Sequence, residues 1–153
     1  MKQRNRKPIK ACRAAFARHG NGNALVEMVL LMPLLLSLSF GAVEYGYAMY
    51  IKHTLQGAAR EGARAAVVAG ATAADVQSMV DSTMQAAGFP QAKYTRPPTI
   101  APASWTTQPA GTAITVTVQA QWGTIGFSAL PTWLGGIPTT KVIAGVTTMR
   151  KEG

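Results

Sequence analysis

The sequence predicts an α+β protein, in which a long N-terminal transmembrane helix continues outside the membrane and is followed by a second short helix and a small antiparallel β-sheet. Three observations support this class. An apolar run covers residues 24–43, a helical pattern of small residues follows it, and residues 113–122 alternate between apolar and polar side chains. Because the helical periodicity precedes the strand periodicity, we expect the helices first and the sheet after them.

The positive charge of the chain is concentrated at its N-terminus. Seven of the fifteen basic residues, and none of the six acidic ones, precede Gly22. The net charge of +9 therefore belongs mainly to this leader and not to a folded basic face, which argues against nucleic-acid binding. The only cysteine, Cys12, also lies in the leader, so neither an intrachain disulfide nor a cysteine metal site is expected.

Residues 24–43 form the predicted membrane span. They are twenty residues with one charged side chain, Glu27, and a helix of that length spans roughly 30 Å, the thickness of a bilayer core. The basic leader then places the N-terminus in the cytoplasm and everything after Tyr50 outside it. A secretory signal peptide is the alternative, but its apolar core is usually shorter, about 7–15 residues.

Three residues of this segment are candidate assembly residues. Glu27 is energetically unfavourable in a membrane, since insertion of a charged residue at mid-bilayer costs about 2.5–3.5 kcal/mol. Charged residues inside membrane spans usually have a function. Pro33 has no N–H for the carbonyl of Val29, which either simply kinks the helix or softens it for packing against other copies. Glu44 is expected near the outer interface, where its charge costs little, together with the tyrosines of residues 45–50.

A stripe of small residues continues the helix as far as residue 69. Its members recur at helical spacing: Leu55, Ala58, Ala59, Gly62, Ala65, Ala66 and Ala69. Small residues permit another element to approach the backbone closely. The neighbouring Arg60, Glu61 and Arg64 form either a solvated face or, with Gly62, a docking face for a partner subunit.

A second helix is predicted over residues 73–87. Gly70 breaks the first helix, and Thr72 with Asp75 resembles a capping box in which Asp replaces Glu. Gly88 and Pro90 end the helix. Its expected apolar side consists of Val76, Met79, Val80, Met84 and Ala87.

The remaining chain predicts strands and one apolar loop. An edge strand is expected near residues 93–100, because Pro97 and Pro98 are excluded from a central strand. The strongest strand covers residues 113–122, and the last covers residues 140–150. Between them, the apolar residues of the loop 123–138 either cover the sheet or leave its Trp and Leu, residues 133 and 134, exposed for contact with other subunits or lipid.

The sequence offers no residues for catalysis. His53 stands alone, and Asp75 and Asp81 are six residues apart and point to different faces of a helix. Neither a nucleophile motif nor a nucleotide loop is present in the glycine-containing loop 123–129. We therefore expect neither enzymatic activity nor a cofactor or metal.

Four motifs in order resemble one protein family, and they are read from residues 24–28, 32–35, 41–46 and 58–64. Their sequences are ALVEM, MPLL, GAVEYG and AAREGAR. Together with a basic leader, a glycine and a Glu at the fifth position after it, they are similar to the TadE-like family, the minor pseudopilins of tight-adherence (Tad/Flp, type IVb) pili. The short length favours TadE-like over the larger TadG-like proteins.

The resemblance implies that the protein lies in the bacterial inner membrane. It also implies that the protein is needed for pilus biogenesis and surface adherence. The expected partners are a prepilin peptidase, other pilins or pseudopilins and the Tad assembly platform. The peptidase would cut between Gly22 and Asn23, although Gly20 offers a second site and Met28 stands where an aromatic residue is common. The expected regions are the cleaved leader 1–22, the span and interface 23–50, a helical region 51–88 and a β-rich region 89–153.

Cleavage would give Glu27 a partner. It creates an α-amine on Asn23, which Glu27 can meet within its own helix or across to the adjacent subunit, where the pair would set the register of assembly. The simpler interpretation is that Glu27 stabilises the helix N-terminus. The alternative function is an unprocessed, single-pass membrane-anchored binding protein that keeps its leader.

Overall fold

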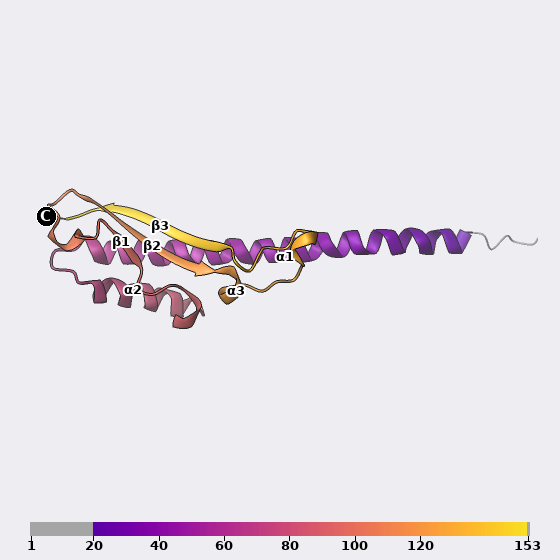
Figure 1. Cartoon of the computed structure of the whole chain (residues 1–153), viewed down its shortest axis with the longest axis horizontal. Helices are drawn as coiled ribbons and strands as arrows, with labels where there is room; N and C mark the ends of the chain where they lie inside the picture. Colours follow the sequence, from indigo (N-terminus) through magenta and orange to yellow (C-terminus); the bar gives the residue numbers. More distant parts are fainter. Residues whose placement is uncertain (1–19, 153) are drawn as a thin grey trace, which may run out of the picture. The chain divides into compact units, whose positions relative to one another are not determined.

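The computed structural model describes residues 20–152, and the side chains from Ala24 onward. The predicted leader before Gly20, with Cys12, lies outside the described residues. The helices and strands are, in chain order, α1 (Gly20–Val67), α2 (Ala73–Ala86), β1 (Thr99–Ala101), β2 (Ala113–Gln121), α3 (Trp122–Ile125) and β3 (Val142–Arg150) (Figure 1). The predicted α+β class is confirmed, with a long apolar helix, a shorter helix and a three-stranded antiparallel sheet.

Contacts divide the chain into two compact parts, of which the first ends at Leu35 and the second begins at Leu36. In the first part, α1 passes through Pro33 without ending. The large apolar side chains of this part are all exposed: Leu25, Val26, Met28, Val29, Leu30, Leu31, Met32, Leu34 and Leu35. Exposure of so much apolar surface to water is unfavourable, and the helix from Ala24 to Val67 contains a stretch long and apolar enough to cross a membrane.

The second part begins at Leu36 and contains the folded core. Here α1 buries one face, and Leu55, Ala58, Ala59, Gly62 and Ala66 lie on it as predicted. The rest of the predicted stripe is different. The helix ends at Val67 before it reaches Ala69, Ala65 is only partly buried, and Ala63 and Val67 are buried instead.

Helix α2 is short and well capped. The Thr72 hydroxyl accepts from the Asp75 N–H at 3.3 Å, and the Asp75 carboxylate accepts from the Thr72 N–H at 2.9 Å, which completes the predicted capping box. The Thr72 hydroxyl, which also donates to the carboxylate, and the Thr72 N–H hold the pKa of Asp75 below its ordinary value. Val76, Val80 and Met84 are buried, whereas the predicted apolar residue Met79 is 43% exposed.

The sheet has the order β1-β2-β3, with both pairs antiparallel. The predicted edge strand exists but is shorter and lies later, at Thr99–Ala101, immediately after the two prolines. β2 is central and alternates as expected, with Ile114, Val116, Val118 and Ala120 buried. β3 pairs with β2 along its whole length, from Val142 opposite Gln121 to Arg150 opposite Ala113.

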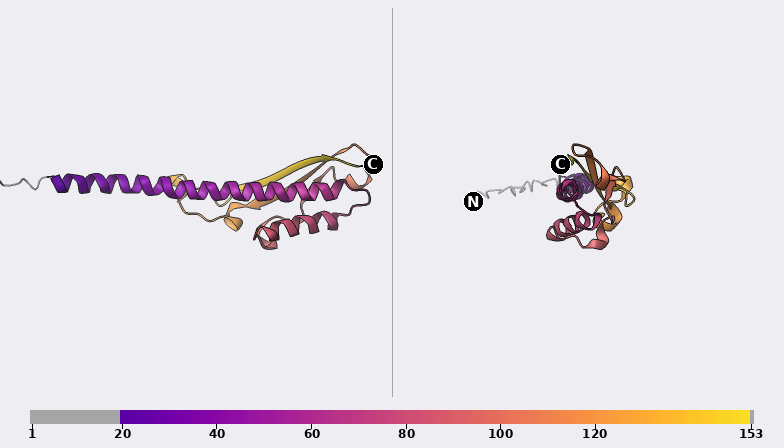
Figure 2. Two further views of the ribbon diagram at one scale, coloured as in Figure 1. Left: turned by 180° about the vertical axis from the view of Figure 1, so that it is seen from behind. Right: turned by 90° about the vertical axis from the view of Figure 1, so that its left-hand side faces the viewer.

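Both helices cover the same face of the sheet. Figure 2 shows α2 beside the second part of α1, with the strands on one side of the pair. One core cluster joins Leu55 of α1, Met84 of α2 and Val118 of β2, and a second joins Ala66, Val76 and Ile114 at the C-terminal end of α1.

Two glycines permit the closest of these contacts. A Cβ on Gly62 of α1 would lie 2.7 Å from Cγ2 of Val80 in α2. A Cβ on Gly145 of β3 would overlap the backbone of Leu55, so β3 crosses α1 in direct backbone contact. Neither position has room for a side chain without movement of its neighbour.

We expect Gly145→Ala to destabilise the fold by about 1–3 kcal/mol, the usual cost of overpacking, because the new methyl group meets rigid backbone. Near-UV circular dichroism of the chain in detergent during urea unfolding measures this loss. Gly57→Ala is the control, since nothing lies within 4 Å of a Cβ there and alanine stabilises an exposed helix by about 0.5–1 kcal/mol. Equal stabilities of the two variants would contradict the contact between β3 and α1.

Candidate assembly site

A buried carboxylate on α1 holds the long loop between α3 and β3. Glu44 is 2% exposed, and its two oxygens accept backbone hydrogen bonds from opposite ends of one segment of that loop. Oε2 accepts from the Leu130 N–H at 3.2 Å, and Oε1 accepts from the Ile137 N–H at 2.8 Å. Two N–H donors stabilise a buried carboxylate, which would otherwise be strongly unfavourable. The sequence predicts Glu44 near the outer interface, and the structure adds that the side chain is enclosed by its own chain.

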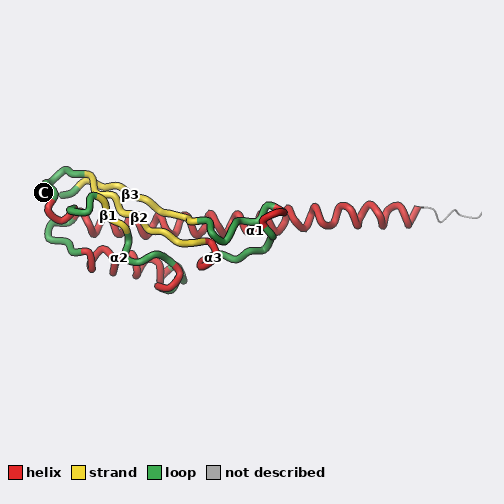
Figure 3. The backbone as a smooth tube through the Cα atoms, viewed as in Figure 1, coloured by secondary structure: helices red, strands yellow, loops and turns green. Residues whose placement is uncertain are grey.

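We call residues 130–137 the clasp loop. It folds back on itself through hydrogen bonds from the N–H groups of Leu134 and Gly136 to the Pro131 carbonyl, at 2.9 and 3.2 Å. Gly135 has φ +94°, and a Cβ on Gly136 would overlap the Leu130 carbonyl. The paired glycines thus bring the two ends of the loop close enough to share one carboxylate. Figure 3 shows the longer connection from α3 to β3, of which the clasp loop is a part, reaching α1 and returning to β3.

The apolar side chains of this loop divide between the protein interior and its surface. Leu130 is buried, and its Cδ1 would lie 3.5 Å from a Cβ on Gly41 of α1. Trp133, in contrast, is 82% exposed, and Leu134 is 42% exposed. The loop therefore uses one apolar side chain to pack on α1 and leaves the larger ones outside.

Two tyrosines of α1 contact α3 and the end of α2. The Tyr47 hydroxyl donates to the Ile125 carbonyl at 3.4 Å, and its ring packs edge-on against Trp122. The Tyr50 hydroxyl donates to the Ala87 carbonyl just after α2, at 3.2 Å. Tyr45 is 62% exposed. Two of the three tyrosines thus serve the fold in addition to any role at an interface.

The predicted docking face at residues 60–64 is divided by the fold. Gly62 is buried beneath α2, so it is not available to a partner. Arg60 is exposed, and Arg64 forms a 3.5 Å ion pair with Glu61 at the surface. The small residues of this motif pack the chain's own core, and only its charged residues face outward.

The residues predicted for processing and register lie in the first part of the chain. Gly22 and Asn23 belong to the first turns of α1, and their side chains are outside the described set. Glu27 is exposed on the apolar segment, and Pro33 lies two turns further along the same helix. The structure places Glu27 and Glu44 differently, since only Glu44 is enclosed by the folded part of the chain.

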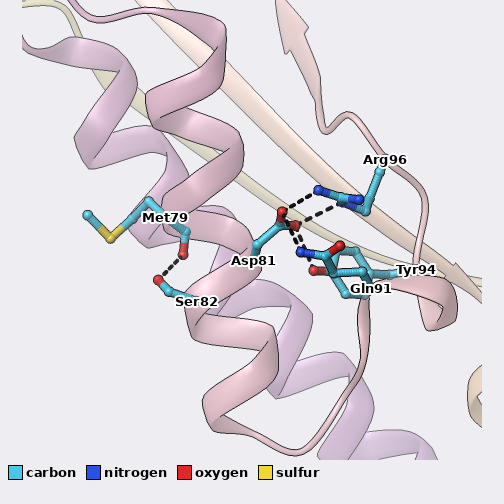
Figure 4. A network of polar contacts seen from close by, with 6 residues as sticks. All are labelled: Met79, Asp81, Ser82, Gln91, Tyr94 and Arg96. Carbon is cyan, nitrogen blue, oxygen red and sulfur yellow. Dashed lines mark hydrogen bonds and ion pairs between the residues drawn. The ribbon is translucent and has the colours of Figure 1, made fainter.

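A second buried carboxylate fastens α2 to the chain that follows it (Figure 4). Asp81 is 8% exposed and accepts from the Tyr94 hydroxyl at 2.7 Å, from Nε and Nη2 of Arg96 and from the Gln91 amide at 3.4 Å. Burial, and then the hydrogen bond to Asp81, raise the pKa of Tyr94. The donors satisfy the carboxylate fully, which assigns this cluster to the fold.

An open groove lies where the clasp loop meets β3 and α1. It has a volume of about 620 Å³ and contains two lysines, Lys52 and Lys141, beside Tyr45, Met49, residues 135–138 and the start of β3. Within residues 20–152, no cluster of three or more His, Cys, Asp or Glu side chains could hold a metal ion.

Sequence reasoning missed the partners of Glu44, which lie 86 and 93 positions away. The signal available was indirect. Gly135 and Gly136 marked a tight turn, and Glu44 was an acidic residue directly after an apolar span. Neither observation connects the two regions, because a backbone N–H donor leaves no trace in the side-chain sequence.

The segment that matches a known protein family lies within α1, the helix that carries Glu44. Residues 22–64 match the sequence model of the TadE-like protein family, which confirms the resemblance over that segment. Searches of curated proteins and of solved structures gave no match. The match ends before α2, so it covers the apolar segment, Glu44 and the small-residue motif, and excludes the sheet and the clasp loop.

We expect Glu44→Gln to release one end of the clasp loop, because the amide keeps one oxygen acceptor and turns N–H donors toward the other backbone N–H. One unsatisfied buried N–H costs about 1–3 kcal/mol. Hydrogen exchange of the Leu130 and Ile137 amides, measured by NMR in micelles, should become faster in this variant.

The matched control is Glu61→Gln, which removes a surface ion pair worth about 0–1 kcal/mol. Unchanged protection of both amides in Glu44→Gln would show that the carboxylate does not hold the loop.

Proposed function

We propose that this chain, whose residues 22–64 carry the TadE-like sequence, is a minor pseudopilin of a bacterial tight-adherence (Tad/Flp, type IVb) pilus. The observation that carries the proposal is the coincidence of the family match with a helix whose apolar side chains are exposed. The protein acts as a structural subunit in pilus biogenesis and surface adherence, and not as an enzyme.

The two parts of α1 suit the two tasks of such a subunit. The apolar run of α1 over residues 24–43 is a single-pass anchor that offers lipid-facing or subunit-facing surface. The part after it is occupied by α2 and the sheet, which form the body outside the membrane. Van der Waals packing between apolar helices then joins the subunit to other pilins or pseudopilins and to the inner-membrane Tad assembly platform.

The proposed orientation follows from charge. The seven leader cations favour a cytoplasmic N-terminus, and the folded part then lies on the periplasmic side of the inner membrane. A prepilin peptidase, which cuts on the cytoplasmic side, would reach Gly22 in this orientation. The family match begins at that residue.

Processing would change the electrostatics of the apolar segment. The new amine on Asn23 provides a positive charge four residues before Glu27, which is near enough for pairing along the helix. The same amine on an adjacent subunit would pair with Glu27 only when the two helices are in register. Removing one partner from a buried pair costs about 3–5 kcal/mol, so a misplaced subunit is disfavoured.

We expect co-expression with the native prepilin peptidase to yield a mature chain that begins at Asn23, as measured by mass spectrometry of the N-terminus. Gly22→Val should abolish the cut, because a branched side chain replaces glycine next to the scissile bond. Gly20→Val is the control and should be processed normally. A chain beginning at Asn21 would move the site to Gly20, and an intact leader in the native host would favour the unprocessed binding protein.

We expect Glu27→Gln to be cleaved normally but to be lost from sheared pili, since a neutral amide cannot pair with an ammonium group. Immunoblots of the membrane and sheared fractions measure both steps. Glu152→Gln, which neutralises an exposed carboxylate outside the apolar segment, should assemble like the wild type. Wild-type assembly of the Glu27→Gln protein would disprove the role of Glu27 in register.

A further inference from the structure

The exposed tip of the clasp loop is the feature that the proposed function leaves unexplained. Trp133 is 82% exposed and Leu134 is 42% exposed, and Phe127, just before the loop, is 43% exposed. The other two tryptophans, Trp105 and Trp122, are almost completely buried. Two of the three indole rings are buried and the third is exposed on a constrained turn. This exposed ring indicates a binding surface.

The loop is fixed at one level of α1. Leu130 packs on Gly41, and both ends of the loop bind Glu44, so the tip lies beside the last turn of the apolar run that ends at Val43. On that turn Phe40 is 50% exposed and Val43 is 58% exposed. The exposed apolar surface of α1 at residues 40–43 thus continues onto the loop. Indole rings favour the headgroup level of a bilayer, which is where a span ending at Val43 places this loop.

The hydrogen bonds of the loop suit that environment. Irregular backbone is tolerated near the hydrocarbon only when its polar groups are paired. The Leu130 and Ile137 N–H groups bind Glu44, and those of Leu134 and Gly136 bind the Pro131 carbonyl. The same arrangement screens the Glu44 carboxylate from lipid, where a bare charge is costly.

The charges beside the loop match a membrane surface. The groove that the loop shares with α1 and β3 is lined by Lys52 and Lys141, and none of its lining residues is acidic. Long cationic side chains next to an apolar tip bind anionic headgroups while the apolar groups enter the acyl boundary.

We propose that the clasp loop is a second membrane contact, in which Trp133 and Leu134 enter the headgroup–acyl boundary of the leaflet on the side of the folded part. The contact holds the folded part against the membrane before the subunit joins a pilus. This proposal depends on one part of the proposed function, the anchoring of the chain in a membrane.

The test uses the full chain reconstituted in vesicles of phosphatidylcholine and phosphatidylglycerol. Tryptophan fluorescence is compared between the wild type and Trp133→Phe, and the difference isolates Trp133. Lipids brominated near the headgroup end of the acyl chain should quench this difference signal, lipids brominated near the chain end should quench it less, and aqueous acrylamide should quench it weakly. Trp133→Phe should lose the lipid-dependent quenching and keep its near-UV circular dichroism.

Three outcomes would overturn the proposal. Strong quenching of Trp133 by acrylamide means that the loop lies in water. Protection from both acrylamide and brominated lipid means that another protein copy covers it. Equal lipid quenching in Trp133→Phe means that a different tryptophan meets the lipid. Flotation of the vesicles is scored separately, because a chain that fails to float contradicts the anchor itself, whereas a floating chain with exposed Trp133 contradicts only the loop contact.

Discussion

The position of the clasp loop depends on a single carboxylate, which is satisfied by two backbone N–H groups. Glu44 stands on α1 where the exposed apolar run gives way to the buried face, and charge-assisted hydrogen bonds from Leu130 and Ile137 keep it acceptable inside the protein. The same bonds, together with the packing of Leu130 against Gly41, fix the loop on α1. One interaction therefore encloses a charge, closes the fold at one end and determines where Trp133 is presented.

Helix α1 satisfies two environments with two kinds of sequence. Large aliphatic residues fill its first part, where lipid or neighbouring helices must provide the contacts. Small residues fill the buried face of its second part, where α2 approaches at Gly62 and β3 crosses at Gly145. The TadE-like match over residues 22–64 includes both kinds. The small residues of the motif 58–64 are thus explained by internal packing. Of the possible docking face, only Arg60 and the Glu61–Arg64 pair remain at the surface.

Local patterns predicted most elements because the responsible interactions are local. The capping box at Thr72, the alternation of β2 and the length of the apolar helix all arise from residues near each other in sequence. Long-range contacts could not be predicted in this way. The sequence left open whether residues 60–64 form a docking face, because α2, which covers Gly62, is not part of the same helix, and it indicated no partner for Glu44, because the donors are backbone groups far along the chain. The network around Asp81 was missed because Tyr94 and Arg96 come from an irregular segment with no periodic signal.

The central claim is that α1 lies in lipid before Glu44 and outside the membrane after it. Single-cysteine scanning along its exposed face tests this most directly, with Cys12 replaced and an impermeant maleimide added to intact spheroplasts of the native host. We expect cysteines at positions 30 and 38 to be labelled only after detergent is added. Cysteines at positions 56 and 60 should be labelled in intact spheroplasts without detergent. Immediate labelling at Leu38, or labelling at Gln56 only after permeabilisation, would contradict the central claim.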